Sequence, residues 1–228
     1  MKMTFGAIVT DGRGKIGGHV ASKNRSGAYL RTKVTPVNGQ TSAQMTIRNR
    51  FTTFAQGWRG ITEAQRDAWN AAVSDYARTN IFGDLHNPTG SALYQRLNNN
   101  LSIIGEAAIL LPPLPAAVGE VTAVSLAIAA GAATMSLVMG AAVPANTNVK
   151  VFATAPLSAG KSFVKSEFRL IDVLAPAAGT PVNLKAKYEA KFGSVGLAGQ
   201  KVFVKLVAVN STTGQEGTAS QVSGIVVA

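Results

Sequence analysis

The sequence predicts an α+β protein of several domains: an extended basic N-terminal arm, a small three-helix region and a C-terminal β-sandwich. Three observations predict this class. Basic residues crowd the first fifty positions, a helical hydrophobic period runs from residue 41 to about 105, and apolar and polar residues alternate after residue 120. The expected divisions are residues 1–40 for the arm, 41–105 for the helices, 106–119 for a linker and 120–228 for the sandwich.

The composition limits the chemistry that the chain can perform. Its 228 residues, 46% hydrophobic, are enough for one large domain or two small ones. Because there is no cysteine, disulfides and thiolate-bound zinc are excluded. With only two histidines, His19 and His86, metal ligands are scarce. We therefore expect neither a metal nor a cofactor.

Charge is concentrated in the arm. Residues 1–50 hold nine lysines and arginines and one acid, Asp11, whereas residues 51–118 hold four basic and five acidic residues. This asymmetry predicts a surface for an acidic partner, either nucleic acid or an acidic protein. The residues expected to make this contact, with a neighbouring subunit or an acidic partner, are Arg13, Lys15, Lys23, Arg25, Arg31 and Lys33.

Residues 12–18, GRGKIGG, match the glycine spacing of a dinucleotide-binding loop. That loop needs a preceding strand, for which residues 5–9 are available, a following helix, and an acid about 20 residues on. The following residues have no helical stripe, and Arg31 and Lys33 occupy the place of the acid. We expect instead an extended arm of strands, joined by a turn at Gly27, whose glycines permit a close backbone approach.

Three amphipathic helices are expected next. Apolar residues in TSAQMTIRNRFTTFAQGW recur at spacings of four, three and four, and Thr41 or Ser42 provides the N-cap. Thr62 and Gln65 form a capping-box pair for the second helix, and the third begins near Ser91. The expected helical core is Ile47, Phe51, Phe54, Trp58, Trp69, Tyr76, Leu93 and Leu97.

The C-terminal part reads as strands. The expected ranges are residues 121–129, 133–139, 148–155, 167–174, 182–188, 201–210 and 218–227. This number of short strands in about 100 residues is typical of an immunoglobulin-like or fibronectin-III-like sandwich. Residues 121–145 carry no charge and are long enough to span a membrane, but their alternation around the AAGAA sequence favours a β-hairpin. No membrane contact and no signal peptide are expected.

Candidate catalytic groups lack the context that they need. Residues 155–162, APLSAGKS, are one residue from a phosphate-binding P-loop, but Pro156 removes an amide and no helical stripe follows. His86 lies near Asp84 in a loop, where a solvated histidine is the commoner case. Glu63 and Asp67 share a helix face, but acids are common in a first turn. We expect that the protein is not an enzyme.

Several motifs of the first two segments resemble virion structural proteins of tailed bacteriophages, notably crAss-like phages. These motifs are GKIGGHVASKNRSGAYLRTKVTPVN, TSAQMTIRNRFTTFAQGW, ITEAQRDAWNAAV and FGDLHNPTGSALYQRLNNNL. The resemblance covers about residues 12–115 and, loosely, the sandwich. It implies a ring or connector subunit of the neck or tail near the portal, located in the virion after assembly in the host cytoplasm.

Two functional hypotheses follow from the sequence. In the first, copies of the chain form a ring through their arms and contact other virion proteins, such as portal or tail components, and passing DNA. A heterologous contact repeated by rotation closes into such a ring. In the second, the chain is a basic accessory protein that binds DNA without sequence preference, in a salt-sensitive manner. The sequence does not distinguish a neck ring, a tail ring and a capsid decoration.

Overall fold

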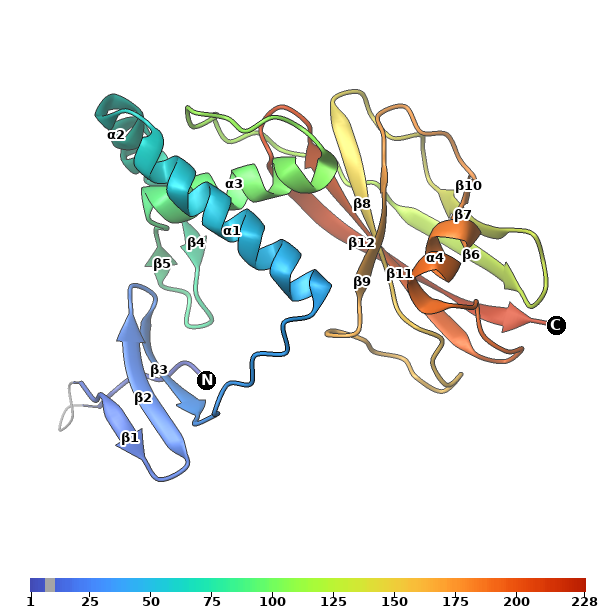
Figure 1. Ribbon diagram of the computed structural model, residues 1–228, viewed down its shortest axis with the longest axis horizontal. Helices are drawn as coiled ribbons and strands as arrows, with labels where there is room; N and C mark the ends of the chain where they lie inside the picture. The colour runs from blue at the N-terminus through green and yellow to red at the C-terminus, as the bar shows by residue number, and fades with distance from the viewer. Residues whose placement is uncertain (7–10) are drawn as a thin grey trace. The chain divides into compact units, whose positions relative to one another are not determined.

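The computed structural model describes residues 1–6 and 11–228 and shows a mixed α+β protein with four α-helices and a large curled β-sheet (Figure 1). The chain forms two compact units. The first unit consists of Met1–Gln95 with Leu110–Leu114, and the second consists of Arg96–Ile109 with Pro115–Ala228.

The arm folds into an antiparallel sheet in the first unit. Its strands are β1 (Gly14–Ile16), β2 (His19–Asn24) and β3 (Gly27–Thr32), in the order β1-β2-β3. The first three residues of the chain pair with β3 through a bridge between Lys2 and Tyr29. Gly27 has a φ of 98°, which favours glycine in the turn between β2 and β3. The strands expected around this turn are therefore confirmed.

Three helices occupy the stretches that the hydrophobic period indicated. They are α1 (Ser42–Gly60), α2 (Glu63–Ala71) and α3 (Gly90–Ile104), and a 3-10 helix, η1 (Ala72–Tyr76), follows α2. Thr41 caps α1 and Thr62 caps α2, each through a complete capping box with the glutamine three residues on. The capping-box prediction for α2 is confirmed.

Aromatic side chains form the centre of the helical part of the first unit. Tyr94 packs against Trp58 at 5.6 Å and against Trp69 at 5.4 Å between ring centroids. Trp69 is fully buried, and its Nε1 donates a 2.9 Å hydrogen bond to the carbonyl oxygen of Leu110. This bond holds the backbone of the linker at Leu110 against α2, while the Leu110 side chain is exposed.

The expected helical core is correct in part. Phe54, Trp69, Tyr76, Leu93 and Leu97 are buried and Trp58 is half-buried, whereas Ile47 and Phe51 are 65% and 62% exposed. Leu97 belongs to the second unit. The expectation for Ile47 and Phe51 is wrong because the buried Phe54 and the contact of Trp58 with Tyr94 of α3 both lie in the C-terminal half of α1, and Ile47 and Phe51 lie before them.

A short hairpin interrupts the loop before α3. Its strands, β4 (Arg78–Thr79) and β5 (Leu85–His86), are only two residues long, which is too short for the alternation that marks a strand in sequence. Asn80 organises the turn because its Oδ1 accepts hydrogen bonds from the backbone amides of Phe82 and Asp84.

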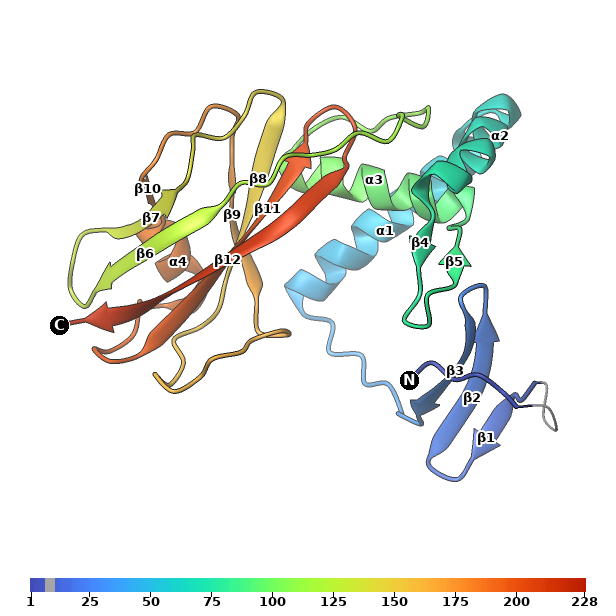
Figure 2. The ribbon, with the colours of Figure 1, turned by 180° about the vertical axis from the view of Figure 1, so that it is seen from behind.

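The second unit contains the curled sheet of seven strands, in the order β10-β7-β6-β12-β11-β8-β9. The strands are β6 (Ala123–Ala129), β7 (Met135–Met139), β8 (Thr147–Ala153), β9 (Arg169–Leu174), β10 (Val182–Asn183), β11 (Lys201–Asn210) and β12 (Glu216–Val227). In Figure 2, β6 runs beside the C-terminal end of β12, where Val226 and Val227 pair in parallel with Ile128 and Ala129.

Strands β6 and β7 pair antiparallel, which confirms the hairpin expected in the uncharged stretch at residues 121–145. No helix in the described part of the chain is long and apolar enough to cross a membrane.

The strand expected at residues 182–188 is wrong. Only Val182 and Asn183 form β10, and the helix α4 (Lys185–Phe192) follows. Tyr188 explains the difference, because its buried ring lies 4.8 Å from that of Phe192, one helical turn further on, and its hydroxyl donates a hydrogen bond to the carbonyl of Thr154. The bond to Thr154 is a tertiary contact, which the sequence pattern around Tyr188 does not reveal.

The core of the second unit joins both halves of the curled sheet. Buried residues of β6 and β7, such as Leu137 and Met139, form one cluster with buried residues of β8 and β11, such as Val151 and Leu206. This arrangement is compatible with a β-sandwich.

Candidate interaction surface

The N-terminal sheet divides its side chains between two faces. Lys15 of β1, Val20 of β2 and Arg31 of β3 stand directly opposite one another, so their side chains lie on one face. Tyr29 lies two residues from Arg31 and is on the same face. Lys33 continues this alternation, since its amide donates a 2.8 Å hydrogen bond to the carbonyl of Gly18.

We call Lys15, Tyr29, Arg31 and Lys33 the basic face. The side chains of Lys15, Arg31 and Lys33 are exposed and that of Tyr29 is half-buried. None of the three basic groups is within ion-pair distance of a carboxylate in the residues that the structure describes. The strand register therefore gathers positive charge that no described carboxylate neutralises.

The other expected contact residues lie apart from the basic face. The side chain of Lys23 lies on the opposite face of the sheet, and its Nζ is 3.7 Å from a carboxylate oxygen of Asp11. Arg13 is 3.9 Å from the same oxygen, and Arg25 lies in the turn between β2 and β3. Asp11 thus partly balances Arg13 and Lys23, and exposed pairs of this kind contribute little stability.

The glycine motif forms a hairpin. Gly14 starts β1, the turn follows at Gly17 and Gly18, and β2 returns antiparallel without any helix. A dinucleotide site needs a helix whose N-terminus is directed at the phosphates. After this motif the chain forms β2 where that helix would begin. Of the strand considered at residues 5–9, positions 7–9 lie outside the described residues.

The near P-loop at residues 155–162 also lacks its helix. It lies in the connection between β8 and β9, which pair antiparallel. Leu157 forms an isolated bridge with Lys201, so the loop is held against the sheet. The interpretation as a hairpin loop is confirmed.

The structure does not bring the other candidate catalytic groups together with a partner for catalysis. Asp84 accepts a 2.9 Å hydrogen bond from the side-chain amide of Asn80, and His86 pairs in the hairpin register with Arg78. Glu63 and Asp67 lie exposed on α2. No three His, Cys, Asp or Glu side chains of the described residues gather as metal ligands do.

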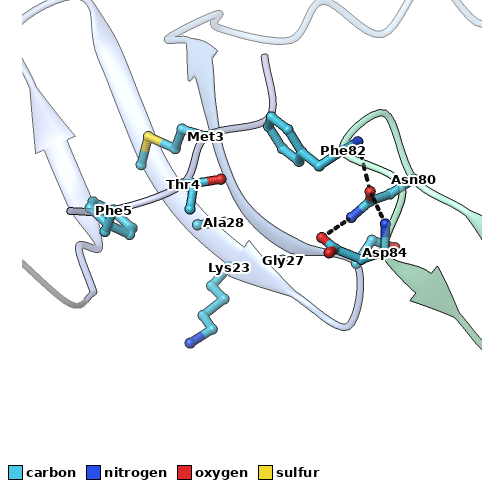
Figure 3. Close-up of a pocket in the computed structure, with 10 residues that line it drawn as sticks. Met3, Thr4, Phe5, Lys23, Gly27, Ala28, Asn80, Phe82 and Asp84 are labelled. Atoms are coloured by element: carbon cyan, nitrogen blue, oxygen red, sulfur yellow. Dashed lines mark hydrogen bonds between the residues drawn. The ribbon is translucent and has the colours of Figure 1, made fainter. Parts of the chain in front are cut away.

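A pocket of about 220 Å³ lies within the first unit, between the start of the chain and the β4–β5 turn (Figure 3). Its charged residues are Lys23 and Asp84. The first is close to Asp11, and the second is bonded to Asn80. These groups hold the local structure together and do not form a catalytic set.

The exposed surface extends from the basic face into α1. Every residue from 31 through 49 is exposed, including Val34, Val37 and Ile47 at 67%, 90% and 65%. Sequence periodicity assigned Ile47 to the core and therefore missed this surface. To predict the exposure of Ile47, one needs to know how much of the length of α1 its packing partners cover, and only the folded chain shows this.

Comparison of the chain with models of protein families, with curated proteins and with solved structures finds no match.

Proposed function

We propose that the protein is a non-enzymatic structural subunit of a tailed phage virion that forms a ring in the neck or tail through contacts of its N-terminal arm. The observation that carries this proposal is the continuous exposure of residues 31 through 49. This stretch combines Arg31 and Lys33 of the basic face with large apolar side chains such as Ile47 and Phe51, which is the composition of a surface that another protein covers.

The poor internal packing of the arm supports the same proposal. Ala21 is the only fully buried side chain among the described residues of 1–40. A few short strands without a core are marginal in water, so this sheet gains stability when it lies on a neighbour. An arm that docks on the next copy, repeated around an axis, closes a ring.

We also propose that the second unit is an immunoglobulin-like or fibronectin-III-like sandwich. The strand order supports this, since β10, β7 and β6 make one half and β12, β11, β8 and β9 make the other. In immunoglobulin domains the first two and the fifth strands share a sheet, and the third, sixth and seventh share the other. Counting β6 as the first strand makes β10 the fifth, β11 the sixth and β12 the seventh, which reproduces this division. The fourth strand, β9, lies beside β8 in the second half.

The alternative function is a basic accessory protein that binds DNA. The basic face favours it, because Lys15, Arg31 and Lys33 have no acidic partner among the described residues and Tyr29 lies beside them. Binding would involve the phosphate backbone and would weaken steeply with salt.

Mass determination after size-exclusion chromatography separates the two functions. For a ring subunit we expect the full chain to assemble into a defined multiple of 23.6 kDa and a chain lacking residues 2–35 to be monomeric. Electron microscopy of virions containing the chain should place it in a ring of the neck or tail. A monomer that binds duplex DNA tightly with and without residues 2–35 would overturn the ring proposal.

A further inference from the structure

The apolar face of α1 is covered along only half its length. Ile47, Phe51, Phe54 and Trp58 lie within about 60° of one another on a helical projection. At the C-terminal end, Phe54 is 9% exposed and Trp58 contacts Tyr94. At the N-terminal end, Ile47 and Phe51 are 65% and 62% exposed to solvent. The face that packs inside the first unit therefore continues outward without a partner.

Positive charge flanks the bare half. At about 100° per residue, Arg48 and Arg50 fall on opposite sides of Ile47 and Phe51. Helix α1 contains no acidic residue, and neither arginine forms an ion pair with a described carboxylate. We call Ile47, Arg48, Arg50 and Phe51 the α1 patch.

Helix α2 presents a surface with the opposite properties. Its exposed side carries Glu63, Ala64, Asp67, Asn70 and Ala71, and its other side buries Trp69. Neither acid is within ion-pair distance of a described basic group. The two alanines are small and leave room for large side chains of another helix, since helix separation depends on the side chains at the contact. We call this side the α2 patch.

From these two surfaces we propose that the α1 patch of one copy docks on the α2 patch of a second copy, in a head-to-tail contact. Arg48 and Arg50 would face Glu63 and Asp67, while Ile47 and Phe51 would cover Ala64 and Ala71. This contact rests on the proposed ring function and specifies which helices join its subunits, in addition to the arm.

Charge decides between this contact and a symmetric one in which two α1 patches meet. If two α1 patches met face to face, four arginines would gather without an acid, and like charges across an interface destabilise it. A two-fold contact uses one self-complementary patch, whereas a ring or a filament needs two different patches that complement each other. The chain carries two such patches.

Charge reversal tests the contact in the full chain. Arg48→Glu with Arg50→Glu, and separately Glu63→Arg with Asp67→Arg, should each raise the concentration needed for assembly by about tenfold or more. In a ring with an even number of subunits, an equimolar mixture of the two variants should restore assembly, because alternating variants bring every α1 patch to an α2 patch of opposite charge. All four substitutions in one chain should restore it as well.

A control variant tests whether negative charge anywhere on α1, outside the α1 patch, impairs assembly. Asn49→Glu with Gln56→Glu adds two acids to exposed positions on the far side of α1 and should leave assembly unchanged. Far-ultraviolet circular dichroism of each variant checks that the helices remain folded. Unaltered assembly of both reversed variants, or failure of the folded variant with all four substitutions to restore assembly, would overturn the contact.

Cross-linking separates failure of the contact from failure of the ring. The chain has no cysteine, so Phe51→Cys and Ala64→Cys in one chain supply its only thiols. A short bis-maleimide should give a ladder of dimers, trimers and larger species, which a two-fold contact cannot produce. An assembled chain without a ladder contradicts the helix contact alone. A wild-type chain that stays monomeric at every concentration, together with a two-cysteine variant that gives no ladder, contradicts both proposals.

Discussion

Trp69 and Tyr94 pack edge to face, with ring centroids 5.4 Å apart and ring planes at 90°. Trp69 comes from α2 and Tyr94 from α3, and both are almost completely buried. The indole N–H also binds the carbonyl of Leu110 at 2.9 Å, so one side chain holds two helices and the linker within the first unit. Such aromatic pairs contribute about 0.5–1.5 kcal/mol beyond the burial of their area.

Trp69→Ala should therefore lower the free energy of unfolding by about 3–5 kcal/mol, through the cavity and the lost contacts. Trp69→Phe keeps an aromatic ring but leaves the Leu110 carbonyl unpaired, at a cost of about 1–3 kcal/mol. Urea denaturation followed by far-ultraviolet circular dichroism measures both values. Trp58→Phe, at a half-buried site, is the control, and a loss as large as that of Trp69→Ala would contradict this assignment.

Lys150 is buried in the second unit, where its ammonium group bonds to the carboxylate of Glu216 and lies 3.3 Å from Oδ1 of Asn100. Glu216→Gln should destabilise the unit by about 1–3 kcal/mol, because a buried cation loses its charged partner. Chemical denaturation measures the change. The control is Glu189→Gln, which breaks a more exposed pair with Lys185 and should cost less than about 0.5 kcal/mol. Equal losses would mean that burial does not strengthen the pair.

Burial raises the pKa of the Tyr188 hydroxyl, which donates a 2.8 Å hydrogen bond to Thr154. In the unfolded chain a tyrosine has a pKa of about 10, so above that pH the unfolded state loses a proton that the folded state keeps. The free energy of unfolding should therefore fall as the pH rises beyond about 10. Denaturation at several alkaline pH values should show a smaller decline in Tyr188→Phe. An identical pH dependence in the two proteins would contradict this.

Gly214 and Gly131 are matched turn glycines in the second unit, with φ of 70° and 77°. A Cβ at Gly214 would overlap the carbonyl oxygen of Leu97, whereas one at Gly131 meets nothing within 4 Å. Gly131→Ala should cost about 1–2 kcal/mol, which is the backbone strain alone. Gly214→Ala should cost clearly more, because α3 or the turn must also move. Equal denaturation midpoints would refute the close approach.

Replacing Arg25, Arg31 and Lys33 together with alanine should weaken assembly more than it lowers the melting temperature. These side chains are exposed and contribute little to folding of the single chain. Mass determination and thermal melting give the two quantities. Replacement of the exposed Lys165, Lys187 and Lys191 with alanine removes the same charge elsewhere and should leave assembly intact. Parallel loss of assembly and stability would show that the arm belongs to the folded core.

Local sequence chemistry was enough for most secondary structure. The spacing of Phe54 and Trp58 predicted α1, the Thr62 and Gln65 pair predicted the start of α2, and alternation predicted β11 at its observed bounds. These signals succeed because caps and side-chain periods depend on residues a few positions apart. The same rules could not foresee α4, whose Tyr188 is fixed by Thr154 from another part of the chain.

The sequence by itself determined that the arm is basic, that it consists of strands rather than a cofactor loop, and which helices and strands exist. Only the tertiary structure decided which charges act together. The strand register places Lys15 and Arg31 on one face and Lys23 on the other, and no described element covers Ile47 and Phe51. The physical reason is that periodicity identifies the apolar side of a helix or strand, whereas burial depends on whether another element is long enough to cover it.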